Sequence, residues 1–290
     1  MLNSDNYKPK SRDRFKQTLD GKKAGDQNIL PSIGQRPKEF EHGFPGDSFF
    51  VMEQMIGVRK EFSAESKDSI KKILAGPMGV GKSYLAIFLA AKAYTEGWPV
   101  LYVADAGELV QSKLSVTGTE ICERFFALSK ERLTFADFKE ILKALSRDTI
   151  VEDTATSTTS RILSSLVCQV DKKALAIIDE HGKLFENNKP APSLFEPLID
   201  IHLWKPASNG ARAIFTGTAF AGYETIILTR DVDSILEFVS PLSNTVFDKL
   251  LASSPLLSEE DVREEPQTTF QGNSTCWSGF LTNLDPKTYT

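Results

Sequence analysis

LAGPMGVGKSYLAIF, residues 74–88, sets three glycines and a Lys-Ser pair between an apolar run and a helical pattern. Its central part, GPMGVGKS at residues 76–83, matches the pattern G-x-x-x-x-G-K-[ST] without a mismatch. Glycines at these places let the backbone curl so that successive N–H groups point at phosphate oxygens, and the helix that follows adds the positive end of its dipole. The stretch therefore predicts a strand, a phosphate-binding loop and a helix.

The residues of this loop have distinct expected roles. Lys82 is expected to reach the β- and γ-phosphates, and the Ser83 hydroxyl is expected to bind Mg²⁺. The structural alternative is a glycine-rich turn between a strand and a helix with an exposed lysine. We predict ATP and Mg²⁺ as cofactors, with the other nucleotide contacts made by Gly76, Pro77, Met78, Gly79, Val80, Gly81 and Tyr84.

A pair of acids ends another apolar run. Residues 174–180 read ALAIIDE, which predicts a buried strand followed by Asp179 and Glu180. Asp179 is expected to hold the hydration shell of Mg²⁺, and Glu180 to polarise an attacking water as a general base. The alternative is a buried strand that ends in a solvated acidic turn. The Asp-Glu order favours ATP hydrolysis of the additional-strand, catalytic-glutamate class. The guanine-recognition pattern Asn/Thr-Lys-x-Asp does not occur in the sequence, but some P-loop families lack it, so guanine specificity stays open.

Three further polar positions are candidates of lower rank. Thr216 ends the apolar run 211–216, where a polar side chain can sense the γ-phosphate or merely satisfy local backbone groups. His181 follows the acid pair and is more typical of a structural histidine than of a substrate contact. An arginine finger is not assigned, and Arg212 is the poorest choice because it begins a strand. The candidates by charge are Arg161, Arg212 and Arg230.

Apolar strands alternate with helical patterns along the middle of the chain. This order predicts an α/β fold, namely a P-loop NTPase three-layer sandwich with a mainly parallel five-stranded sheet and a partial helical lid. We expect a basic, largely disordered segment at 1–45, the NTPase domain at 46–252, and a poorly packed tail or incomplete lid at 253–290. The strands are expected within 69–76, 98–105, 174–180, 211–218 and 234–242, and the helices within 48–62, 82–97, 106–173, 193–204 and 243–251.

Bulk composition limits the possible partners. The net charge of −5 at 290 residues gives no global footprint for nucleic acid, although residues 1–23 carry seven basic side chains against three aspartates. That basic segment leaves a nucleic-acid or protein partner open, and a homo-oligomer is also possible. The sequence has no 18-residue apolar stretch, so we expect no membrane association. It has no visible signal peptide, so we expect an intracellular location, in the cytoplasm or nucleus.

Four stretches resemble the Crinkler-type NTPases, effector-like proteins of fungi and oomycetes. They are GPMGVGKSYLAIFLAAKAYTEGWPVLYVADAGEL, ALAIIDEHGKLFENN, AIFTGTAF and LEFVSPLSNTVFDKLL, within residues 76–251. The resemblance implies an AAA+-like or STAND-like ATPase module that acts as a nucleotide-driven switch or effector. It implies the same loop residues as phosphate and Mg²⁺ contacts, with Asp179 and Glu180 as the metal and hydrolytic acids. By analogy with the family, it also allows secretion into a host.

The stretch GWPVLYVADA, residues 97–106, also resembles a segment that follows the P-loop in the mitochondrial small-ribosomal-subunit GTPase family. This is the alternative family. Three functions stay open on the sequence: a Mg²⁺-dependent NTPase, a structural module that holds nucleotide without useful turnover, and nucleotide-dependent action on nucleic acid.

Overall fold

The computed structural model describes residues 12–29, 33–37, 48–111, 113–145, 152–170, 172–185, 196–204, 208–217 and 235–253. These residues form a parallel five-stranded sheet of order β4-β5-β6-β3-β7, which confirms the predicted α/β sandwich. The strands are β3 Ile70–Ala75, β4 Val100–Val103, β5 Ala174–Ile178, β6 Ala211–Thr216 and β7 Leu236–Phe238.

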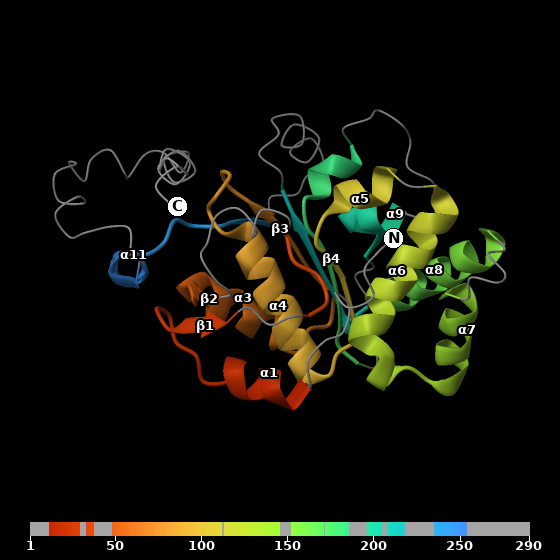
Figure 1. The fold of residues 1–290 in the computed structure, drawn as a ribbon, viewed down its shortest axis with the longest axis horizontal. Helices are drawn as coiled ribbons and strands as arrows, with labels where there is room; N and C mark the ends of the chain where they lie inside the picture. Colours follow the sequence, from red (N-terminus) through yellow and green to blue (C-terminus); the bar gives the residue numbers. More distant parts are fainter. Residues whose placement is uncertain are drawn as a thin grey trace, which may run out of the picture.

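Helices cover both faces of this sheet because the strands are apolar on both sides. In β4, Tyr102 packs into the core beneath α4, whereas Leu101 and Val103 pack into the core beneath α6 and α8. Figure 1 shows α1, α3 and α4 on one side of the sheet and α6, α7 and α8 on the other. The helices are α1 Arg12–Leu19, α3 Glu53–Ser63, α4 Lys82–Glu96, α5 Ala106–Gln111, α6 Leu114–Ser129, α7 Phe135–Leu145, α8 Glu152–Val167, α9 Glu196–Ile199 and α11 Asn244–Ser253.

The strand order decides which loops meet. Strand β6 lies between β3, which leads into the glycine-rich loop, and β5, which leads into the acid pair. This is the additional-strand arrangement that the Asp-Glu order predicts. All five strands run parallel, so their carboxyl ends share one edge, which is where open α/β sheets bind ligands.

The N-terminal part of the chain differs from the expected disorder. Residues 12–29 contain α1 and the short strand β1 Gln27–Ile29, which pairs antiparallel with β2 Ser48–Phe50. Helix α1 packs on α4 because Phe15 and Leu19 are buried, with the Phe15 ring edge-on to Tyr94. Within this segment, residues 12–29 thus carry regular structure that the sequence did not lead us to expect. Two apolar side chains one turn apart suffice to dock a short polar helix.

Other expectations fall partly outside the described residues. The residues outside the described part include 1–11, 38–47 and 254–290. The tail that we expect at 253–290 therefore lies almost wholly outside the described residues. The segment expected to lead into a lid, residues 236–251, is described in full and contains β7 and most of helix α11. None of the helices that the structure describes is both long and apolar enough to cross a membrane.

Side chains pair with the outer edge of β4. The Gln35 amide donates from Nε2 to the Tyr102 carbonyl at 2.6 Å, and its Oε1 accepts from the Ala104 N–H at 3.1 Å. Two residues before Tyr102 on the same strand, the backbone of Val100 is paired in the same way. The Ser129 hydroxyl accepts from the Val100 N–H at 2.9 Å and donates to the Val100 carbonyl at 3.1 Å. Two polar side chains thus take the place of a neighbouring strand.

The opposite edge, on β7, has the same arrangement. Gln54 of α3 donates from Nε2 to the Phe238 carbonyl at 2.8 Å, and its Oε1 accepts from the Ser240 N–H at 2.9 Å. A glutamine amide carries a donor nitrogen and an acceptor oxygen side by side, so it matches the alternating carbonyl and N–H groups of a strand edge.

Arg212 is the second residue of β6, at the end of the sheet away from the acid pair, which agrees with its low rank as an arginine finger. Its side chain is fully buried and donates to the carbonyls of Phe62 at 2.9 Å, Ala64 at 3.0 Å and Asn209 at 2.7 Å. We expect Arg212→Lys to lower the free energy of unfolding by about 1.5 kcal/mol, because an ammonium cannot span three carbonyls in a fixed plane. Urea unfolding measures this, with the exposed Arg161→Lys as a control that changes stability little.

Candidate nucleotide-binding site

The loop between β3 and α4 needs its glycines. Gly76, Gly79 and Gly81 have φ angles of 131°, 82° and 99°, in the region that favours glycine. A β-carbon at Gly76 would also lie 3.3 Å from the Val239 carbonyl oxygen, which follows β7. The loop therefore curls tightly against the end of β7, and α4 begins at its close with Lys82.

Lys82 lies folded back over this loop. Its Nζ donates to the carbonyls of Gly76 at 2.7 Å and Pro77 at 2.9 Å. These two carbonyls belong to half-buried and exposed residues, so water can replace the ammonium if it turns toward another oxygen. The cation is thus already positioned at the curl that the sequence predicts to hold phosphates.

Four of the predicted residues meet in one hydrogen-bond network. The Ser83 hydroxyl donates to Asp179 Oδ1 at 3.2 Å, and the Thr216 hydroxyl donates to the same oxygen. The Glu180 N–H lies 3.1 Å from Asp179 Oδ1 and 2.9 Å from Thr216 Oγ1. The ends of β5 and β6 and the first turn of α4 are therefore joined through one carboxylate oxygen.

The second carboxylate oxygen of Asp179, Oδ2, is distinct from the one that the network uses. Asp179 is fully buried, and its Oδ2 has no hydrogen-bond partner among the described residues. Burial raises the pKa of this carboxyl to about 6, against the hydrogen bonds from Thr216 and Ser83, which lower the pKa. A buried carboxylate oxygen beside a serine hydroxyl suits a metal-bound water, because Mg²⁺ keeps several waters and takes few protein ligands. The described residues hold no group of three or more His, Cys, Asp or Glu side chains that could hold a metal ion.

Glu180 has an unusual backbone. Its φ of 55° is the one positive value among the described residues other than glycine. The two hydrogen bonds that its N–H donates hold this conformation, and the 3₁₀ helix η4 His181–Leu184 begins directly after it. Its side chain stays one-third exposed. Backbone strain of this kind gathers at functional sites, where surrounding contacts fix it.

His181 has a structural position. Its ring is fully buried, with Nε2 3.0 Å from the Leu198 carbonyl oxygen. It stacks on Phe215 with ring centroids 4.2 Å apart, and Phe185 meets it edge-on. The ring packs among Phe215 of β6, Phe185 after η4 and the backbone of α9, as the structural interpretation of this residue predicts.

The remaining predicted residues lie around the loop or away from it. Met78 is exposed at the crown of the loop, and Tyr84 of α4 packs against Phe49 of β2 with centroids 6.0 Å apart. Arg161 of α8 forms an ion pair with Asp137 of α7, so the structure does not bring it to the network. Arg230 lies outside the described residues.

Sequence reasoning missed two charged residues beside Glu180. Asp105 follows β4, and Lys183 of η4 places its Nζ 3.1 Å and 3.3 Å from the two Asp105 oxygens. Asp105 had a detectable signal, since it is an acid at the carboxyl end of a strand adjacent to β5. Lys183 had none, because one lysine in a loop is common.

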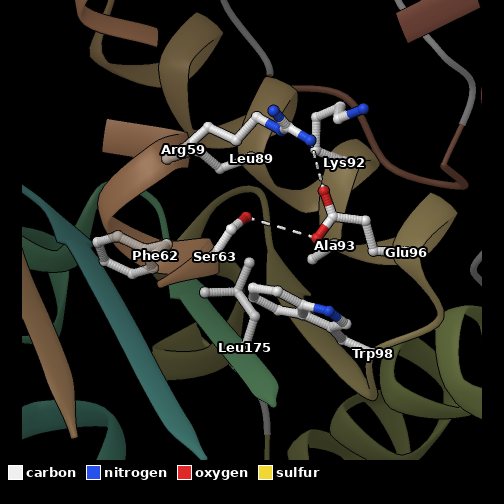
Figure 2. A pocket seen from close by; sticks show the side chains of 9 residues that line it. All are labelled: Arg59, Phe62, Ser63, Leu89, Lys92, Ala93, Glu96, Trp98 and Leu175. Atoms are coloured by element: carbon white, nitrogen blue, oxygen red, sulfur yellow. Dashed lines mark hydrogen bonds and ion pairs between the residues drawn. The ribbon is translucent and has the colours of Figure 1, made fainter. Parts of the chain in front are cut away.

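A small pocket lies at the opposite end of the sheet, between α3 and the last turns of α4 (Figure 2). Glu96 accepts from Arg59 at 2.9 Å and from Ser63 at 3.5 Å, so the polar groups there join the two helices. We assign this pocket a packing role. It is lined by Arg59, Phe62, Ser63, Leu89, Lys92, Ala93, Glu96, Trp98 and Leu175.

One comparison with known proteins spans the first half of this site. The family model described as mitochondrial ribosomal death-associated protein 3 matches residues 53–128. The match covers α3, the phosphate loop, β4 and most of α6, and it ends before Asp179. No curated protein matches the chain. The matched family is the mitochondrial ribosomal alternative that residues 97–106 suggest, whereas the Crinkler resemblance gains no support. Over less than half of its length, the chain is thus similar to a P-loop NTPase-related family.

Proposed function

We propose that this chain binds a nucleoside triphosphate with Mg²⁺ and serves as a nucleotide-holding module of a larger assembly. One observation carries the proposal: Ser83 Oγ lies 3.2 Å from the buried Asp179 carboxylate, directly beside the glycine-rich loop. A Gly-rich turn without nucleotide function has no need of that pairing. The family match over residues 53–128 supports the same conclusion.

Each residue of the network has a task in this binding. The loop N–H groups and Lys82 would hold the phosphate oxygens, and Ser83 Oγ would be a direct ligand of Mg²⁺. Asp179 would accept hydrogen bonds from metal-bound water, with Thr216 holding its other oxygen in place. The metal ion supplies positive charge against the phosphates.

Calorimetric titration with ATP and GTP, each with Mg²⁺ and with EDTA, tests the proposal. We expect at least one nucleotide to bind, with Mg²⁺ strengthening the affinity. Binding also raises the melting temperature, because a ligand at 100 times its Kd adds about 2.7 kcal/mol of stability. No heat and no thermal shift with either nucleotide would overturn the proposal. The comparison of ATP with GTP decides between the two bases.

Hydrolysis is a second candidate function, and the geometry of Glu180 favours it. The N–H of this residue is fixed by Asp179 and Thr216, and its side chain is partly exposed at the same edge of the sheet. A carboxylate so placed beside a metal-associated acid can orient and deprotonate water. Strand β6 lies between β3 and β5, and an additional strand at this place is typical of the catalytic-glutamate class of ATPases, which supports this candidate.

We expect Glu180→Gln to lower phosphate release by about 100-fold and to leave nucleotide affinity nearly unchanged, because the amide cannot accept the proton of water. A phosphate-release assay measures the rate, and calorimetry measures the affinity. If wild type releases no phosphate above the rate of the Gln variant, hydrolysis fails as a function and nucleotide holding remains.

The family name also suggests partners. It points to a mitochondrial ribosomal assembly, and so to a mitochondrial location in place of the expected cytoplasm or nucleus. We extend this to the chain as a proposal: its partners are RNA and proteins of such an assembly, and a homo-oligomer is the competing arrangement. Light scattering of the purified chain, with and without nucleotide, distinguishes a monomer awaiting partners from a self-assembling ring.

A further inference from the structure

Lys183 lies between two carboxylates at the ends of neighbouring strands. Its Nζ pairs with both oxygens of Asp105 and lies 3.9 Å from Glu180 Oε2. Its side chain is about one-third exposed, while that of Asp105 is largely buried. Asp105 Oδ1 also accepts from the Gly107 N–H at 2.8 Å, which anchors this carboxylate on the first turn of α5.

The charges of this group matter for a phosphate ligand. Asp105, Glu180 and the nearby Asp179 bring three acids to the edge of the sheet where the phosphate loop lies. A triphosphate carries more negative charge than a diphosphate, so its last phosphate meets more repulsion from such acids. Lys183 is the cation that the structure places within 4 Å of two of them.

We propose that Lys183 neutralises Glu180 and so makes the site selective for a nucleoside triphosphate over a diphosphate. Asp105 holds the lysine in place, and the lysine in turn holds the Glu180 carboxylate. Lys183 is thus a positioning residue that acts through Glu180. The inference rests on the proposed nucleotide site and adds its specificity to it.

Lys183→Met tests this with binding alone, so the test does not depend on turnover. The probes are the slowly hydrolysed analogue ATPγS and ADP, both with Mg²⁺. We expect the ATPγS affinity to fall about five- to tenfold, which is the size of one partly screened charge interaction, and the ADP affinity to change less than twofold. Lys183→Arg should restore most of the selectivity because it keeps the charge.

A double-mutant cycle shows whether Lys183 acts through Glu180. In the Glu180→Gln background, Lys183→Met should change the ATPγS affinity less than twofold, because the carboxylate that needs neutralising is gone. Equal effects in both backgrounds would overturn the proposal.

Two results separate this inference from the proposed function. If wild type binds neither an adenine nor a guanine nucleotide, both fail together. If wild type binds both and Lys183→Met weakens them equally, nucleotide binding stands and the selectivity role is wrong. The exposed Lys139→Met on α7 is the matched control and should leave both affinities unchanged. Circular dichroism confirms that each variant is folded.

Discussion

Asp179→Asn should make the nucleotide-free chain more stable at pH 7.5, by about 2 kcal/mol, and should abolish the effect of Mg²⁺ on nucleotide affinity. The reason for the first effect is that Asp179 is fully buried and its Oδ2 has no partner among the described residues. An amide fits the same space without a charge, and its oxygen can still accept from Ser83 and Thr216.

The stability difference should depend on pH. The folded chain raises the Asp179 pKa from 3.8 to about 6, so the folded state binds this proton more tightly than the unfolded state does. The stability contributed by the protonated form is complete below about pH 4 and is lost as the pH rises through about 6. The gap between Asp179→Asn and wild type should therefore shrink when urea unfolding is repeated at pH 4.5.

The second effect follows from the metal. Mg²⁺ and its waters favour the ionised carboxylate, so wild type should bind nucleotide about tenfold more tightly with Mg²⁺ than with EDTA, and more so above pH 6 than below it. The Asp179→Asn variant should bind nucleotide with the same affinity in Mg²⁺ and in EDTA. Asp248→Asn, at an exposed position on α11, is the control. An Asn variant that is less stable than wild type at pH 7.5 would show that the carboxylate is satisfied without metal.

Lys82→Ala is expected to weaken nucleotide binding about 100-fold, or about 2.7 kcal/mol. The ammonium now binds the carbonyls of Gly76 and Pro77, and it would exchange them for phosphate oxygens of far greater charge. Alanine leaves the two carbonyls to water, so we expect the melting temperature of the nucleotide-free chain to change by less than about 2 °C. Calorimetry and thermal unfolding measure the two quantities.

A matched control keeps this result interpretable. Lys139→Ala removes the same charge from the exposed face of α7 and should not affect nucleotide affinity. If Lys82→Ala binds nucleotide as wild type does, the loop is a structural turn and the proposed site is wrong. If the variant instead unfolds, Lys82→Gln retains a donor to the loop carbonyls and tests the charge alone.

The site was predictable where its residues are adjacent in sequence. The loop at 76–83 and the acid pair after β5 depend on local patterns, and a parallel sheet brings their ends to one edge. Thr216 was predictable for the same reason, as the last residue of an apolar strand. What the patterns did not reveal is that Thr216 and Ser83 share a single oxygen of Asp179.

Contacts made by single polar residues could not be predicted. Gln35 lies in a stretch rich in proline and glycine, and its amide pairs with Tyr102, 67 residues further along the chain. Lys183 contacts Asp105 across 78 residues. No periodicity marks such pairs, because each depends on one side chain and on a neighbour that only the fold supplies. The docking of α1 was missed because its average composition is polar.

The two glutamines at the rims of the sheet limit how this chain can join a larger complex. Many proteins bind a partner by adding a strand of that partner to the edge of their own sheet. This needs a row of backbone N–H and carbonyl groups at the edge that have no other hydrogen-bond partner. Gln35 and Gln54 already satisfy those groups at Tyr102–Ala104 and Phe238–Ser240. A partner that added a strand to either edge of the sheet would have to displace one of these two glutamines. Contacts through helices or loops are therefore favoured. Gln54 also belongs to α3, whose preceding residue Met52 lies against Gly81 of the phosphate loop.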